Sequence, residues 1–290
     1  MGILPLIRLV RPHQWVKNLL VLAPLFFSTQ LNQTSVVRAI AAVAVFVGLA
    51  SAAYCLNDVI DSKIDRVHPT KRTRPVASGE ISERTALLIG AVIFTLATWG
   101  AAQIGEQFLY IALLYTVLQI SYTTSAKHIA ILDLMILALL YLVRVLGGAA
   151  AAGVQASAWI LICTWLVALL LASGKRYIEL VNCEALQAGT RPVLNEYSAN
   201  FLDHLLPSTA AMTLMSYLLW CSESVENGRF SSVMVFPSAL FVTYGVLRYL
   251  LRVLNRSFDE DPTSGLLNDR PLLVTIVLYV GWMGLVLYVH

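Results

Sequence analysis

Long apolar runs separated by short polar connections extend along almost the whole chain. A helix needs about 20 mainly apolar residues to cross the hydrocarbon core of a bilayer. Nine segments approach this pattern, and the first and the fourth are short. The segments are 15–29, 36–56, 85–103, 107–122, 130–150, 157–173, 203–220, 232–252 and 271–289. The pattern predicts an all-α polytopic membrane protein with about nine transmembrane helices in a single domain, residues 1–290.

The composition supports the same class. The chain is 58% hydrophobic and only 13% charged, which excludes an ordinary soluble domain. Residues Met1 to Val10 form a short start that carries Arg8, and the first long apolar run lacks an A-x-A site, so we expect no cleavable signal peptide. The four cysteines lack metal-ligand spacing and are expected to be reduced. The net charge of +3 is carried by the connections, so it does not indicate nucleic-acid binding.

The distribution of Lys and Arg predicts the orientation. If the N-terminus lies inside and all nine segments cross, every one of the 20 Lys and Arg residues except Arg38, Arg144 and Arg229 falls on the inner side. This asymmetry matches the positive-inside rule. We therefore expect a protein of the cell membrane with a cytoplasmic N-terminus and an external C-terminus. The longer inner connections would be 57–84, 174–202 and 253–270, and a shorter one would be 122–129.

The first of these connections carries a stripe of oxygen ligands. Asn57, Asp61 and Asp65 recur every four residues, and Asp58 lies at the edge of the same face if the segment is helical. Carboxylate and amide oxygens suit Mg²⁺, which normally shares its coordination between a few carboxylates, waters and substrate phosphates. We predict a metal site on this stripe.

Basic residues follow the stripe directly. His68, Lys71, Arg72 and Arg74 are cations of the kind that bind phosphate oxygens. A charged loop that only sets topology is the alternative interpretation, but acids contribute little to orientation. The combination of acids and bases therefore favours a metal-pyrophosphate site.

Further candidates lie near the ends of other segments. Tyr122 and Lys127 belong to the 122–129 connection, and Lys175 and Arg176 follow the sixth segment, where either could simply reach the lipid headgroups. Taken with Lys71, Arg72 and Arg74, they indicate more cations than a metal-bound pyrophosphate needs. A ligand with additional phosphates would use that surplus. The small residues at 147–153 predict close helix packing.

These motifs resemble a known superfamily. Asn57 to Asp65 matches the N-D-x-x-D-x-x-x-D signature of UbiA-type intramembrane prenyltransferases. The resemblance implies a helical bundle around a cavity that opens to lipid and is capped on the cytoplasmic side. The second signature of that superfamily, D-x-x-x-D, is replaced here by Gly174-Lys175-Arg176-Tyr177-Ile178-Glu179.

One branch of the superfamily resembles this chain more closely, the decaprenyl-phosphate phosphoribosyltransferases. Its motifs are similar to Arg11-Pro12-His13-Gln14-Trp15-Val16-Lys17-Asn18, to His68 through Pro75, to Leu142-Val143-Arg144 with Gly147-Gly148, and to Gly174 through Leu180. The branch implies Mg²⁺-dependent transfer of 5-phosphoribosyl from 5-phosphoribosyl 1-diphosphate to a polyprenyl phosphate, for arabinose-donor synthesis in arabinogalactan cell walls.

The resemblance also implies roles for the candidate residues. Asp58, Asp61 and Asp65, with Asn57, would hold Mg²⁺ on the leaving pyrophosphate. The anionic acceptor would be positioned by four cations, with Tyr122 donating a hydrogen bond. These cations are Lys17, Lys127, Lys175 and Arg176. Lys71, Arg72 and Arg74 would take the remaining phosphate oxygens of the donor.

Two other functions stay open at this point. An aromatic or quinone prenyltransferase would use a prenyl diphosphate donor and a second carboxylate pair. A transporter would place ionisable groups near the middle of the membrane, where only Arg144 is expected. A homo-oligomer is compatible with either function and with the phosphoribosyltransferase.

Overall fold

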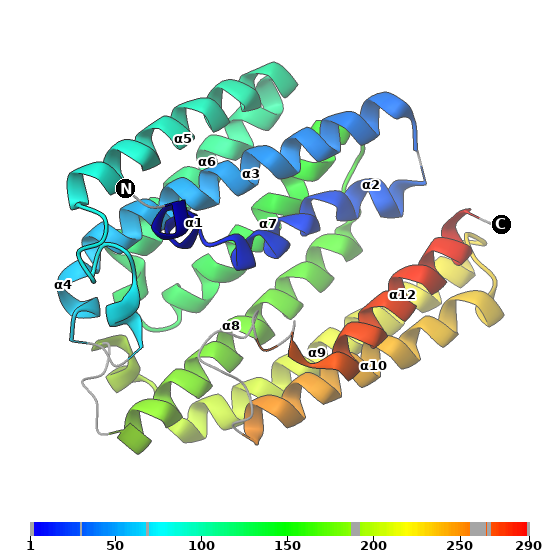
Figure 1. Ribbon diagram of the computed structural model, residues 1–290. Coiled ribbons are helices and arrows are strands. Elements are labelled where there is room, and N and C mark those ends of the chain that lie inside the picture. The colour runs from blue at the N-terminus through cyan, green and yellow to red at the C-terminus, as the bar shows by residue number, and fades with distance from the viewer. Residues whose placement is uncertain are drawn as a thin grey trace. The chain divides into compact units, whose positions relative to one another are not determined.

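The computed structural model describes residues 3–29, 31–67, 70–186, 192–255, 265 and 268–288. This part of the chain is helical with irregular connections and contains no strand (Figure 1). In chain order its elements are α1 (Ile3–Val10), the 3-10 helix η1 (Pro12–Leu22), α2 (Ala23–Ser28), α3 (Gln33–Ile60), α4 (Ser62–Asp65), η2 (Lys71–Thr73), α5 (Glu83–Ile104), α6 (Glu106–Thr124), η3 (Ala126–His128), α7 (Leu132–Ala152), α8 (Ala158–Leu186), η4 (Pro192–Glu196), α9 (Ala199–Glu226), α10 (Ser232–Leu254) and α12 (Arg270–Tyr288).

Within the described ranges, six helices are long and apolar enough to cross a membrane. They are Gln33–Ile60, Glu83–Ile104, Leu132–Ala152, Ala158–Asn182 within α8, Ser232–Leu254 and Arg270–Tyr288. The helices α6 and α9 also match predicted segments but are not among these six. The predicted class, an all-α membrane protein, is confirmed.

Two expected features of the chain differ in the structure. The segment 15–29 is not one α-helix, because a 3-10 helix from Pro12 leads into the short helix α2, which has Pro24 in its first turn. Proline donates no backbone hydrogen bond and so favours such a break. The connection expected to begin at residue 174 is also shorter, because α8 continues to Leu186.

The described chain forms two compact units. The first contains Met1–Ala126 and Val143–Ala156. In it, α3 packs along α5, and α6 contacts both helices (Figure 1). Phe46 of α3 meets Phe108 and Tyr115 of α6 edge to face, with ring centroids 5.8 and 5.2 Å apart. This geometry suits aromatic rings and fixes α3 against α6. The segments α1 and η1 lie against α3.

The small residues of α7 allow the closest approaches in this unit. A Cβ atom on Gly147 would lie 2.5 Å from the ring of Phe46, and one on Gly148 would overlap the backbone carbonyl of Val21 in η1. The prediction of close packing is therefore confirmed at these two positions. Their lack of a side chain lets the 3-10 segment reach the helix surface.

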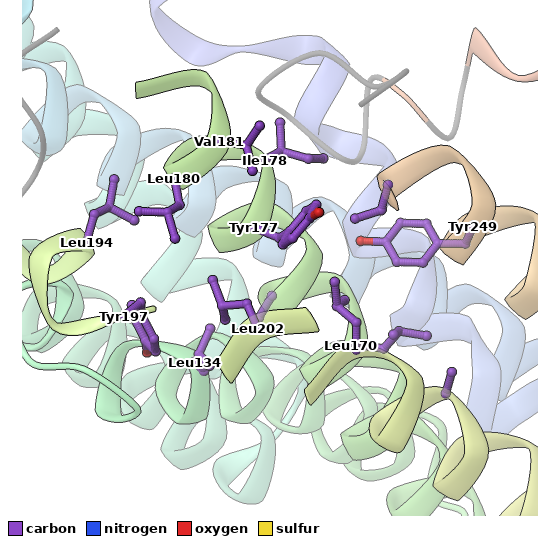
Figure 2. Close-up of a cluster of buried hydrophobic side chains, with 14 of the residues drawn as sticks. Leu134, Leu170, Tyr177, Ile178, Leu180, Val181, Leu194, Tyr197, Leu202 and Tyr249 are labelled. Atoms are coloured by element: carbon purple, nitrogen blue, oxygen red, sulfur yellow. The ribbon is translucent and has the colours of Figure 1, made fainter. Parts of the chain in front are cut away.

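The second unit contains Lys127–Leu142 and Ser157–His290. Its helix α8 packs on α9, and α10 contacts both α9 and α12. A buried apolar cluster joins α8, α9 and α10 with the start of α7, and Figure 2 shows Tyr177, Leu202 and Tyr249 within it. Gly174 of α8 faces the hydroxyl of Tyr249, where a Cβ atom would not fit. This core fixes the part of α8 that carries the predicted basic residues.

The contact of Gly148 with Val21 generates a testable expectation. Gly148→Ala should lower the stability in detergent by about 1–3 kcal/mol, the usual cost of overpacking, because the nearest neighbours of the added methyl group are backbone atoms of Val21. Gly284→Ala is the matched control, since no described atom of a neighbouring element lies within 4 Å of the position that its methyl group would occupy on α12. Thermal unfolding of both variants measures the difference, and equal midpoints would contradict the packing argument.

Candidate active site

The acidic stripe lies where α3 passes into α4. α3 ends at Ile60, Asp61 is its C-cap residue, and α4 begins at Ser62. The helical hydrogen bonds nevertheless continue across the junction, because the Asp61 amide donates to Asn57 O at 2.9 Å and the Asp65 amide donates to Asp61 O at 2.8 Å. Each bond joins residues four apart, as in an α-helix. The backbone therefore keeps the predicted spacing of Asn57, Asp61 and Asp65.

Two acids of the stripe are buried and paired with arginines. Asp58 is 1% exposed and Asp65 is 4% exposed. Arg11 donates to Asp58 Oδ1, and Arg74 Nη1 lies 2.6 Å from Asp65 Oδ2 and 3.7 Å from Asp58 Oδ1. Buried carboxylates require such partners, since an isolated charge in an apolar environment is costly. The four side chains form a compact group of alternating charge, which we call the Arg11–Asp58–Arg74–Asp65 cluster.

Arg11 was not among the predicted site residues, although it begins one of the motifs that carry the family resemblance. Its backbone is left-handed (φ 51°, ψ 66°), and it directly precedes Pro12, which disfavours the right-handed helical region at the preceding residue. Its guanidinium lies 5.0 Å from the ring centroid of Tyr54 on α3. The Arg11-Pro12 pair was the sequence feature that could have indicated a role for Arg11, but only the fold identifies Asp58 as its partner.

Arg74, which is predicted to bind donor phosphate, contacts the acids in this structure. Burial lowers the pKa of Arg74, and the nearby charge of Arg11 lowers it further, while Asp65 and Asp58 oppose the change. The two guanidiniums therefore repel each other and are held together by the carboxylates between them.

The cluster fits a divalent metal only in part. Asp58 Oδ2 is buried and has no hydrogen-bond partner in the described structure. Among the described residues, no three His, Cys, Asp or Glu side chains gather as a metal-ligand group. Hard oxygen donors within two helical turns suit Mg²⁺, provided that substrate phosphates and waters complete its coordination. The residues therefore fit a metal that arrives with a phosphorylated ligand.

The other basic candidates of the first unit come from η1 and from the segment that follows the acidic stripe. Lys71 is half-buried and Arg72 is exposed on η2, Lys17 is half-buried on η1, and His68 lies outside the described residues. Arg8 of α1 donates to the carbonyl of Thr73 at 3.4 Å and pairs with Glu80. These contacts connect α1 to the loop that carries Lys71, Arg72 and Arg74.

Arg144 is held inside the first unit. Its Nε donates to Asn18 Oδ1 at 2.8 Å, and its Nη2 donates to the Tyr115 hydroxyl at 2.9 Å. Asn18 belongs to η1 and Tyr115 to α6, so one side chain of α7 fixes two other elements. Because Lys17 directly precedes Asn18, this contact also fixes the segment that presents Lys17.

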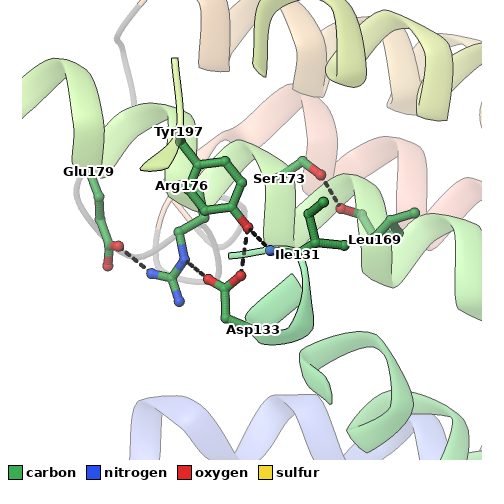
Figure 3. A network of polar contacts seen from close by, with 7 residues as sticks. All are labelled: Ile131, Asp133, Leu169, Ser173, Arg176, Glu179 and Tyr197. Atoms are coloured by element: carbon green, nitrogen blue, oxygen red, sulfur yellow. Dashed lines mark hydrogen bonds and ion pairs between the residues drawn. The ribbon is translucent and has the colours of Figure 1, made fainter. Parts of the chain in front are cut away.

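A second charged network lies in the second unit, as Figure 3 shows. Arg176 is fully buried, with its Nε 2.5 Å from Asp133 Oδ2 and its Nη1 paired with Glu179. The Tyr197 hydroxyl donates to Asp133 Oδ1 at 2.6 Å and accepts the Ile131 amide proton at 2.6 Å. Burial raises the pKa of Tyr197, and its bond to Asp133 raises it further.

This network stabilises the connection between α6 and α7. Ile131 has a positive φ of 66°, which is costly for a β-branched residue and is held here by Tyr197. Lys127 lies four residues earlier and is buried, while Tyr122 and Lys175 are half-buried. The expectation for Arg176 was a phosphate contact. Its two carboxylate partners and complete burial instead favour a structural role, whereas Lys127 and Lys175 keep their predicted roles as candidates.

Comparison with known protein families identifies the chain. A model of the UbiA prenyltransferase family matches residues 19–264. The chain belongs to this family. The matched region extends across both compact units.

Relatives of similar sequence cover nearly the whole chain. It is 30% identical to decaprenyl-phosphate phosphoribosyltransferase of Mycobacterium tuberculosis over 96% of this chain and 92% of that protein. It is 31% identical to the protein of the same name from Corynebacterium glutamicum, over 98% and 87% of the two chains. These similarities agree with the branch that the motifs indicated.

Solved structures confirm the fold. A UbiA homologue from Archaeoglobus fulgidus, solved with DMAPP and Mg²⁺, superimposes with a TM-score of 0.74 at 19% identity, covering 98% of this chain and 99% of that one. A UbiA homologue from Aeropyrum pernix K1 gives a TM-score of 0.64 at 19% identity over 95% of each chain.

Arg176→Ala should destabilise the protein by about 3–5 kcal/mol, because it leaves Asp133 and Glu179 as buried acids without their shared cation. The neighbouring variant Lys175→Ala should change stability by less than about 1 kcal/mol. Unfolding in detergent measures both. A stable Arg176→Ala protein would show that the network does not support the fold.

Proposed function

We propose that this protein transfers the 5-phosphoribosyl group from 5-phosphoribosyl 1-diphosphate to a polyprenyl phosphate such as decaprenyl phosphate. The near-complete similarity to enzymes of that name supports the proposal. The observation in this structure that supports it is that Asp133 and Glu179 are both occupied as ion-pair partners of Arg176, and so are not presented as the second carboxylate pair that a prenyl diphosphate donor would use. The part of α8 that replaces the family's second aspartate motif is thus engaged in an internal ion pair.

The proposed reaction exchanges one oxygen substituent on the ribose. The bond from C1 of the ribose to the pyrophosphate oxygen breaks, and its electron pair leaves with pyrophosphate. A phosphate oxygen of the lipid forms the new bond to C1. The acceptor is already an anion at neutral pH, so the protein does not need to remove a proton from it. The reacting carbon passes through a cationic state, as in other glycosyl transfers.

The residues of the stripe would stabilise the leaving group. Asn57, Asp58, Asp61 and Asp65 are the proposed ligands of Mg²⁺, which when bound would neutralise charge on the departing pyrophosphate. Lys71, Arg72 and Arg74 are proposed to contact other phosphate oxygens of the donor. Lys17, Lys127 and Lys175 are proposed contacts for the remaining anionic groups, with Tyr122 as a hydrogen-bond donor. For Arg176 we propose a structural role, in which it stabilises the connection between α6 and α7 that carries Lys127.

The proposal also includes the orientation predicted from Lys and Arg placement, with the N-terminus and the acidic stripe in the cytoplasm of the cell. A soluble sugar donor would then reach the stripe from the cytosol, while the lipid acceptor would enter from the bilayer. Synthesis of an arabinose donor for the cell wall is the proposed use of the product.

The assay combines membranes containing the protein with labelled 5-phosphoribosyl 1-diphosphate, decaprenyl phosphate and Mg²⁺. We expect an acid-labile sugar phosphate that extracts with the lipid, and its loss on chelation with EDTA. A parallel reaction offers a prenyl diphosphate with 4-hydroxybenzoate. Efficient prenylation of the ring without phosphoribosyl transfer would overturn the proposal in favour of an aromatic prenyltransferase.

Asp61→Ala should lower the transfer rate by about a hundredfold or more, the usual effect of losing one electrostatic contact to a developing charge. Glu106→Gln is a matched control, since this exposed acid at the start of α6 lies outside the stripe and accepts a hydrogen bond from Tyr110 on its own helix. Rates are compared at equal amounts of folded protein. Unchanged activity of Asp61→Ala at saturating Mg²⁺ would remove Asp61 from the site.

A further inference from the structure

Two of the carboxylate oxygens that a metal would use are already engaged by arginines. Arg11 contacts Asp58 Oδ1, and Arg74 contacts Asp65 Oδ2. Only Asp58 Oδ2 of these two carboxylates is both buried and without a hydrogen-bond partner in the described structure. A metal that coordinated both carboxylates in the usual way would compete with the two guanidiniums for these oxygens.

The charges of the cluster make this competition unfavourable for a metal alone. The two buried carboxylates of the cluster are matched by two guanidiniums, so the cluster itself is neutral, and Asp61 is the one remaining acid of the stripe. A divalent cation added without an anion would place two positive charges beside Arg11 and Arg74, in an environment that screens charge poorly. A diphosphate group that arrives with the metal supplies the missing negative charge.

The two arginines are also placed to change partners. Their side chains are 18% and 20% exposed, in contrast to the fully buried Arg176. A guanidinium has five N–H donors, and single Nη atoms make the contacts of Arg11 and Arg74 to the acids. Donors on the same groups could therefore contact phosphate before the carboxylates are released, and the fork geometry of arginine suits phosphate oxygens.

We propose that Arg11 and Arg74 are exchangeable counter-ions. Before the donor binds they neutralise Asp58 and Asp65, and when a metal-diphosphate unit enters they transfer to the diphosphate oxygens while the metal takes the carboxylates. The inference rests on the proposed function for the identity of the site, and it adds an order of binding. The metal and the diphosphate enter together, and the metal alone binds weakly.

Mn²⁺ is a suitable probe because its preference for oxygen ligands in octahedral geometry resembles that of Mg²⁺. The purified protein is titrated with Mn²⁺, and the free ion is measured by electron paramagnetic resonance, with and without inorganic pyrophosphate. Titrations of pyrophosphate alone and of Mn²⁺ with pyrophosphate in buffer correct for complexes formed off the protein. We expect pyrophosphate to increase Mn²⁺ affinity by about tenfold or more, the scale of one charge-assisted contact. Equally tight binding without pyrophosphate would overturn the proposal.

Variants test the arginines directly. Arg11→Gln and Arg74→Gln should each strengthen the binding of Mn²⁺ alone and weaken pyrophosphate binding by about tenfold, for the same reason. Arg38→Gln is the matched control, because it removes an exposed cation from the same helix as Asp58 but near the opposite end of that helix. It should change neither value.

The conservative variants keep the test decisive. Arg11→Lys and Arg74→Lys retain the charge and should bind Mn²⁺ alone as weakly as the original protein. If the glutamine variants do not fold, the titration of the original protein and the lysine variants decides the outcome. Weaker binding of Mn²⁺ alone in a folded glutamine variant would contradict the proposal. These experiments measure the binding of Mn²⁺ and pyrophosphate, not sugar transfer. Their results can therefore be interpreted even if the transferase assay fails.

Discussion

Charge buried at the ends of apolar helices must be neutralised locally, and this constraint organises both units of the protein. At the end of α3, Arg11 and Arg74 neutralise Asp58 and Asp65. These pairs attach the N-terminal segment and the loop after η2 to the helix junction. Without them, the acids of the stripe would be buried without compensation, at a cost of several kcal/mol. The acidic site and the local fold thus depend on the same contacts.

The same constraint has a different result in the second unit. Arg176 has two acidic partners and no exposed surface, and Tyr197 extends the contacts to the backbone of Ile131. Every change of partner there would leave a buried charge behind. The network is therefore suited to fixing a connection, while the partly exposed arginines of the first unit are suited to exchanging partners. Exposure, more than residue type, separates the two roles.

Small and aromatic residues complete the support of the first unit. Gly147 and Gly148 admit the Phe46 ring and the η1 backbone, and Arg144 then connects Asn18 with Tyr115. A continuous α-helix through residues 15–29 would not place Asn18 and Val21 in the same way, because a 3-10 helix turns every three residues. The irregular segment gains a defined position from contacts that lie more than 100 residues away in sequence.

The sequence by itself determined the features that depend on local pattern. Apolar runs of sufficient length can satisfy their backbone in a membrane only as helices, so the class followed from them. The spacing of Asn57, Asp61 and Asp65 reflects the helical repeat and held across the α3–α4 junction. The tertiary structure alone decided which charges meet. Arg11 and Asp58 are 47 residues apart and Arg176 and Asp133 are 43 apart, and no periodicity relates such positions. Two adjacent basic residues, Lys175 and Arg176, point in different directions on a helix, so only packing could bury one and leave the other partly accessible.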